Sequence, residues 1–213
     1  MCIRDSLHAL GEVRDLPRLC VASLAEQVRM HALRSHADAC TELIGRLERF
    51  TTPKAYKRWG MLGSLVKLQA GLARAYAAMV AQDWKRMLAE LDASKPVAEK
   101  LRRTRDGIQI NLLQALALKR CGEDSQALFS EAISMAESLG LERILVDTHP
   151  DLIDWVRRIR GGSEAAAAFI APRPEVRQGG DKLPAARPAA RATASLSALL
   201  TPKEAEVLSL IHI

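Results

Sequence analysis

The chain has 213 residues, 48% of them apolar but only 4% aromatic, and its formal net charge is +6. This length fits one domain with accessory segments, and a composition rich in Ala and Leu favours helices over sheets. Charged residues interrupt every apolar run before it reaches membrane-spanning length, which argues against contact with a membrane. We therefore expect an all-α protein of the cytoplasm whose positive charge lies mainly on solvated helix faces.

Apolar side chains recur at helical spacing along most of the chain up to residue 160. The predicted helices are 16–35, 37–50, 55–81, a helix that starts after Asp83, a helix that starts near Thr104, 125–139 and 151–160. Gly60, Gly63 and Gly71 lie within the third helix, where small residues allow another helix to approach closely but weaken the helix by up to about 1 kcal/mol each relative to Ala. Pro96 either interrupts or kinks the fourth helix. The fifth helix is apolar on more than one face, so it should lie between neighbouring helices.

Short connections join these helices into pairs, which we interpret as antiparallel hairpins. Each hairpin leaves an apolar face that only the next hairpin can cover, an arrangement typical of α-solenoids. The hairpin over residues 111–139 is similar to the second half of a tetratricopeptide repeat, because Gly122 is followed by Ala127 and Leu128. The expected fold of residues 7–160 is therefore an α-solenoid of tetratricopeptide-like hairpins.

Residues 161–197 are rich in Ala, Pro, Gly and Arg and lack apolar periodicity. Such a segment cannot bury enough surface to offset the loss of chain entropy on folding, so we expect a flexible linker. Its basic residues either contact phosphates or only keep a tether soluble. They are Arg173, Arg177, Lys182, Arg187 and Arg191.

The stretch 200–207, LTPKEAEV, reads as the start of a helix. Thr201 can cap the first backbone donors, Pro202 fits the first turn, and Glu204 can complete a capping box. Together with Lys203, this stretch resembles the opening of the LuxR-type helix-turn-helix. In that family the first helix supports a DNA-binding unit whose recognition helix enters the major groove. The resemblance implies that residues 198–207 begin a truncated domain of this type without a complete DNA-binding site; an ordinary capped helix is the alternative.

A second stretch, MAESLGLERILVD at 135–147, is similar to the closing segment of the helical region in MalT-like regulators. There a phrase such as A-x-x-x-G-x-x-R-x-x-x-D precedes a last helix, a linker and a LuxR-type domain, the same order as here. The resemblance implies a transcriptional regulator whose helical region senses a small-molecule or protein effector and whose mostly missing helix-turn-helix binds promoter DNA. It also implies an N-terminal module that binds ATP in many relatives, but we expect no cofactor in this chain.

The two ends of the chain are related at the level of DNA. Residues 1–6 can be encoded by ATGTGTATAAGAGACAG, and the reverse complement of that string encodes residues 208–213. The element resembles a transposon end used to prepare sequencing libraries. We therefore expect both ends to be adapter sequence and the chain to be a fragment of a longer gene. Coincidence is the alternative, because a LuxR-type helix can also continue as V-L-x-L-I.

No catalytic constellation and no glycine-rich phosphate loop occur in the sequence, so we expect no enzyme. His31 and His36 are five positions apart with a polar break between them, whereas a metal pair on one helix face needs a spacing of four. We therefore expect no metal site. Cys20, Cys40 and Cys121 are widely spaced in helical segments, which indicates reduced core cysteines.

A few other polar and aromatic residues are candidates for ligand contacts. Tyr56, Trp59 and Tyr76 either line a ligand-binding face or belong to the core. Asn111 and Gln114, on an otherwise apolar helix, either contact an effector or mark its solvent edge. The competing function is a helical-repeat scaffold that binds another protein and has no DNA-binding activity.

Overall fold

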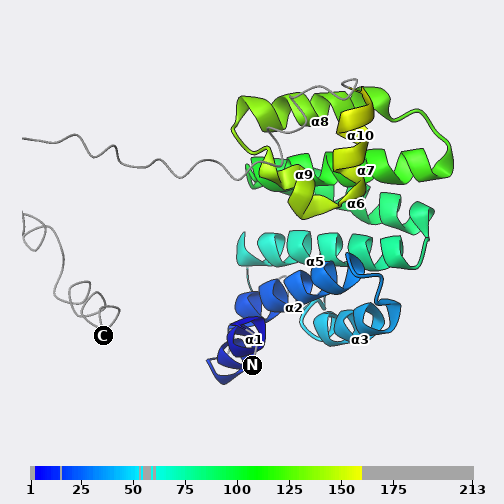
Figure 1. Cartoon of the computed structure of the whole chain (residues 1–213). Coiled ribbons are helices and arrows are strands. Elements are labelled where there is room, and N and C mark those ends of the chain that lie inside the picture. Colours follow the sequence, from blue (N-terminus) through cyan, green and yellow to red (C-terminus); the bar gives the residue numbers. More distant parts are fainter. Residues whose placement is uncertain (1–2, 15, 53, 55–58, 60, 160–213) are drawn as a thin grey trace, which may run out of the picture. The chain divides into compact units, whose positions relative to one another are not determined.

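The structure, a computed structural model, describes residues 3–14, 16–52, 54, 59 and 61–159. These residues contain no strand, so the all-α prediction is confirmed for this part of the chain (Figure 1). The helices are α1 (Ile3–Val13), α2 (Pro17–Ala32), α3 (Ala37–Glu48), α5 (Met61–Val80), α6 (Trp84–Lys100), α7 (Thr104–Cys121), α8 (Gln126–Ser138), α9 (Arg143–Thr148) and α10 (Asp151–Ile159).

The chain divides into two units between Ala171 and Pro172, and every described residue belongs to the first unit. The predicted linker 161–197, the helix start at Thr201 to Glu204 and the C-terminal adapter segment therefore lie outside the described residues. These predictions stay untested.

The helix boundaries follow the local sequence signals. Asp83 caps α6, because its Oδ1 accepts a hydrogen bond from the Arg86 amide at 3.0 Å. That helix continues through Pro96 to Lys100, so the proline does not interrupt it. Gly122 ends α7 with a φ of +81°, a left-handed conformation that glycine adopts without the strain that a Cβ adds.

Helix α1 was not among the predicted elements. Its first residues, 3–6, belong to the segment attributed to adapter sequence, so no helix was predicted there, although Ile3, Leu7 and Leu10 recur at helical spacing. Leu10 and Val13 remain exposed. The helix is held by close contact with α2: a Cβ at Gly11 would lie 2.6 Å from the Cys20 Sγ and 3.0 Å from its backbone nitrogen. Residues 3–6, which we attribute to adapter sequence, fall within α1; their origin stays a prediction.

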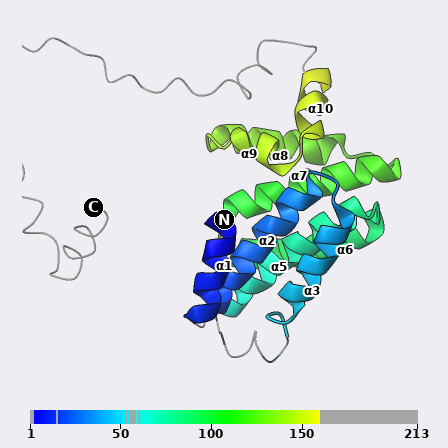
Figure 2. The ribbon, with the colours of Figure 1, turned by 60° about the horizontal axis from the view of Figure 1, so that its bottom comes forward.

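Helices that follow one another in the chain pack against one another (Figures 1 and 2). Helix α2 contacts α1, α3 and α5, and the packing continues from α5 to α6, from α6 to α7 and from α7 to α8. Gly71 allows the close approach of α5 and α6, because a Cβ there would lie 2.2 Å from the Ser94 Oγ. Whether these hairpins are structural repeats stays a prediction.

Helix α7 lies at the centre of the packing between its neighbours. All its residues from Ile108 to Ala117 are buried, which confirms the prediction from its apolar pattern. Helix α10, the last described helix, is held against α8, because the Trp155 ring stacks on Phe129 with 3.8 Å between ring centroids. No described helix combines the length and apolar character that a membrane span requires.

Candidate functional site

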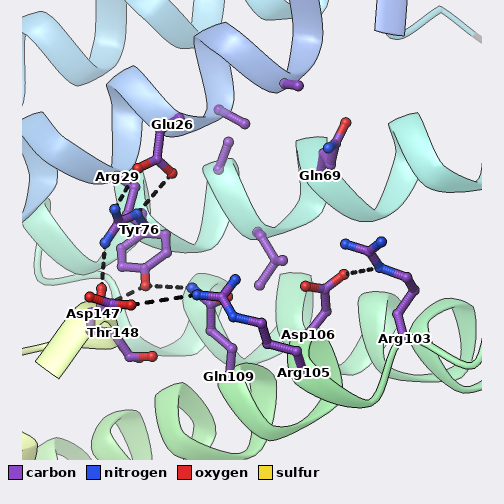
Figure 3. Close-up of a pocket in the computed structure, with 14 residues that line it drawn as sticks. Glu26, Arg29, Gln69, Tyr76, Arg103, Arg105, Asp106, Gln109, Asp147 and Thr148 are labelled. Carbon is purple, nitrogen blue, oxygen red and sulfur yellow. Dashed lines mark hydrogen bonds and ion pairs between the residues drawn. The ribbon is translucent and has the colours of Figure 1, made fainter. Parts of the chain in front are cut away.

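A polar cavity of about 310 Å³ lies between α2, α5, α7 and α9 (Figure 3). Helices α2 and α5 each line it with residues at positions i, i+3, i+4 and i+7, which share one helix face. Small side chains at Ala22, Ala25 and Ala73 leave room between the helices. The polar residues that line the cavity are Glu26, Arg29, Gln69, Tyr76, Arg103, Arg105, Asp106, Gln109, Asp147 and Thr148.

Arg29 connects the first and last helices of the cavity. Its Nε donates to the Glu26 carboxylate at 2.9 Å, and a second guanidinium nitrogen pairs with the other carboxylate oxygen. The remaining nitrogen donates to the backbone carbonyl of Asp147, 118 residues away in the chain. The hydrogen bond to Glu26 raises the pKa of Arg29 against the opposing effect of burial, so the guanidinium stays charged.

Tyr76 forms the deep end of the cavity. Its hydroxyl donates to the Thr148 carbonyl at 3.2 Å and accepts from the Gln109 Nε2 at 2.8 Å. Burial raises the pKa of Tyr76 to about 12, so the phenol stays neutral and can donate at physiological pH. The ring belongs to the core, which was one of the two alternatives for this residue. The residue also lines the cavity, and whether it contacts a ligand stays a prediction.

The start of α7 forms the outer end of the cavity. The Arg103 Nε donates to the Asp106 Oδ2 at 2.8 Å. The Arg105 Nη2 lies 3.6 Å from one carboxylate oxygen of Asp147, and the Arg143 Nε lies 3.6 Å from the other. About half of the Arg103 and Arg105 side chains is exposed, so both guanidinium groups are accessible to a ligand.

No family model, curated protein or solved structure matches the chain. The geometry of the described residues therefore carries the functional argument, together with the motifs in the sequence.

The two histidines lie together, in contrast to the prediction. Their Nδ1 atoms are 3.3 Å apart, because the chain turns back at Ser35, whose φ is +60°. The expectation that the polar break separates His31 from His36 was wrong. Within the described residues, no group of three or more His, Cys, Asp or Glu side chains is arranged to hold a metal ion.

The two polar residues of α7 do not mark a solvent edge. Asn111 and Gln114 are both buried, and the Gln114 Nε2 donates to the Asp92 Oδ1 of α6 at 2.6 Å. Neither residue lines the polar cavity, to which α7 contributes Arg105, Asp106 and Gln109. Trp59 lines a separate, more apolar hollow with Phe50, and Tyr56 lies outside the described residues.

The three cysteines differ from one another. Cys20 and Cys40 are buried core thiols, as expected, and burial raises the pKa of Cys40. Cys121 is exposed, so its assignment to the core was wrong. It is the last residue of α7, where the helix leaves the core.

Most of the cavity residues were not among the sequence-based candidates. Glu26, Arg29 and Gln69 are polar residues on helix faces that otherwise pack inward, and this exception to the pattern is the signal that could have identified them. Asp147 was part of the MalT-like closing phrase, but nothing in that phrase indicates a partner in α2. Only Tyr76 was named beforehand as a possible ligand contact.

Proposed function

We propose that the described helices are the sensing region of a LuxR-type, MalT-like transcriptional regulator of the cytoplasm. Its DNA-binding unit is the helix-turn-helix whose first residues are 198–207. The observation that carries the proposal is the order of segments in the chain: helical hairpins, the closing phrase at 135–147, a Pro- and Ala-rich stretch, and LTPKEAEV. This order supports the proposal more strongly than either motif alone.

The position of the cavity supports a sensing role. Its walls include α2 near the start of the unit and α9 within the MalT-like closing phrase. A ligand that binds more tightly when α9 has one position than another shifts the equilibrium between the two. Because α9 directly precedes α10, the last described helix, such a shift changes the end of the described unit from which the chain continues toward residues 198–207.

The test of this proposal is to sequence the parent gene across both junctions with long reads. A reading frame that continues after Val207 through three further helices, one of them a recognition helix, supports the regulator. A frame that stops directly after Val207, or a native terminus at 208–213, contradicts it.

A helical-repeat scaffold for another protein is the second candidate. The observation that favours it is a set of exposed apolar side chains on and near α1. They are Leu7, Leu10, Val13, Leu16 and Leu62. In a scaffold, the parent gene ends soon after Val207, so the same sequencing experiment separates the two candidates.

A further inference from the structure

We infer that the cavity between α2, α5, α7 and α9 binds a small organic anion, a carboxylate or a phosphate, that also carries a hydrogen-bond donor. Arg103 and Arg105 hold the anionic group, and Gln69 accepts the hydrogen bond from the donor. The inference deepens the proposed function and rests on it for the ligand's role as effector.

The charged side chains of the cavity balance in number but differ in how fully their hydrogen-bonding groups are paired. Arg29, Arg103 and Arg105 face Glu26, Asp106 and Asp147, so the formal charges cancel. Arg29 is fully engaged, since it pairs with both oxygens of Glu26 and with the Asp147 carbonyl. Arg103 and Arg105 use fewer of their N–H donors on protein partners than Arg29 does.

Among the charged side chains of the cavity, Arg103 and Arg105 have hydrogen-bond donors that are not paired with another side chain. Within the described residues, Arg103 uses only its Nε, on Asp106. Arg105 has a single ion pair at 3.6 Å, which is longer than a hydrogen bond. A guanidinium group carries several N–H donors in a planar fork that matches a carboxylate or a phosphate. These two side chains therefore present unpaired donors to an anion.

The acidic groups of the cavity are less available. The Asp106 side chain is 10% exposed and is held by Arg103. Asp147 lies between Arg105 and Arg143, with one carboxylate oxygen toward each. A cationic ligand at Asp147 would lie beside the guanidinium groups of Arg105 and Arg143, which repel it, whereas an anion adds a partner to Arg105 and Arg103.

Gln69 is the reason why the ligand should also carry a hydrogen-bond donor. Its Oε1 is buried and has no hydrogen-bond partner within the described residues, and leaving such an acceptor unpaired costs free energy. An N–H or O–H group of a ligand satisfies it. The volume of about 310 Å³ is at the small end of ligand sites and fits a metabolite rather than a peptide.

The first test measures thermal unfolding of the full chain with four small probes at constant ionic strength: glycerol 3-phosphate, glycerate, glycerol and 1,3-diaminopropane. All have a similar carbon skeleton but differ in charge. We expect a saturable rise in the unfolding temperature with at least one of the two acids. Stabilisation by glycerol 3-phosphate alone identifies the anion as a phosphate, and stabilisation by glycerate alone identifies it as a carboxylate. Stabilisation by the diamine alone, or by none of the probes, overturns the inference.

The second test compares variants that remove the same charge. Arg105→Gln and Arg103→Gln should each weaken binding of the active acid about tenfold, because each removes a charge-assisted hydrogen bond. Arg157→Gln is the matched control: Arg157 is also about half exposed and also pairs with an acid three positions away, but it lies on α10 outside the cavity. Equal binding by all three variants would show that the acid binds elsewhere.

The results of these binding measurements do not depend on whether the proposed function is correct. If an acid binds and the parent gene ends after Val207, the anion site stands and the regulator does not. If the gene continues into a complete helix-turn-helix and no acid binds, the regulator stands and its effector site lies elsewhere.

Discussion

Single side chains in this protein join helices that are far apart in the sequence. The Tyr76 ring is in the core, while its hydroxyl connects Gln109 of α7 to the Thr148 carbonyl at the end of α9. Arg29 makes a similar connection from α2. Polar contacts of this kind define one arrangement of the helices, because a buried donor or acceptor that loses its partner costs free energy.

Tyr76→Phe tests the contribution of the hydroxyl. The substitution keeps the ring but leaves the Gln109 amide and the Thr148 carbonyl unpaired, so we expect a loss of about 1–3 kcal/mol in the free energy of unfolding. Urea denaturation measures it. Gln114→Leu, which removes a partly buried hydrogen bond outside the cavity, is the control for a general effect of lost polar contacts.

The same variant has a defined pH dependence. Burial raises the pKa of Tyr76 from 10.0 to about 12 in the folded protein, so the unfolded chain releases the phenolic proton first. The stability that depends on the protonated phenol is complete below pH 10 and is lost as the pH rises toward 12. Wild-type stability should fall more steeply over this window than that of Tyr76→Phe; parallel curves would contradict the assignment.

At the scale of elements, the helices of the described part were largely predictable and their contacts were not. The starts of α3, α6 and α7 agree closely with the predicted positions, since apolar spacing and caps act within a few residues. Helix α1 was missed because its first residues were attributed to adapter sequence, although Ile3, Leu7 and Leu10 recur at helical spacing. Its packing depends on Gly11, whose role only the folded structure reveals.

Gly11→Ala should separate α1 from α2. The new Cβ would lie 2.6 Å from the Cys20 Sγ, a distance that real Cβ atoms do not show, and 3.0 Å from the Cys20 backbone nitrogen, which is a tight contact. We therefore expect destabilisation of about 1–3 kcal/mol. The thiol of Cys20, now buried, should also react faster with a thiol reagent. Gly45→Ala is the control, because its Cβ meets open space and should stabilise α3 by up to about 1 kcal/mol.

Helix α10 begins with a hydrogen bond that depends on pH. The Nδ1 of His149 accepts the Asp151 amide at 3.2 Å, which requires the neutral ring. Burial lowers the pKa of His149, with the Asp151 carboxylate acting against this effect and Arg120 adding to it. The unfolded chain therefore binds a proton first, and stability falls as the pH drops below the ordinary value of 6.5.

His149→Asn checks this effect, since Asn provides a capping acceptor that does not titrate. We expect the free energy of unfolding to depend less on pH between about 7 and 5 than in the wild type. An identical pH profile for the wild type and His149→Asn would contradict the role of His149.

At the scale of the whole molecule, the cavity could not be read from the sequence because it is assembled from four helices. Arg29 and Asp147 meet across 118 positions, and no local pattern encodes that distance. His31 and His36 show the same limit over a short range, since one left-handed residue between them decides whether they meet. Local patterns predict the elements, whereas long-range contacts create the site.

For the chain as a whole, we expect weak DNA binding without sequence preference. It carries only residues 198–207 of the segment that resembles a helix-turn-helix, whereas its net charge of +6 attracts phosphates non-specifically. Gel-shift titrations with several unrelated duplexes should give similar affinities that fall steeply with added salt. Tight binding to one operator sequence by this chain would contradict the proposed division between sensing and DNA-binding regions.

The order of translation determines when the hydrogen bond from Arg29 to the Asp147 carbonyl can form. When α2 leaves the ribosome, Arg29 has only its local partner Glu26, and α9 has not yet been translated. The early helices can pack as they emerge, because contacts run between neighbours in the chain. The cavity is completed only when α9 arrives, so a nascent chain that stalls before residue 143 has already translated Gln69, Arg103 and Arg105 but lacks one of the four walls of the cavity.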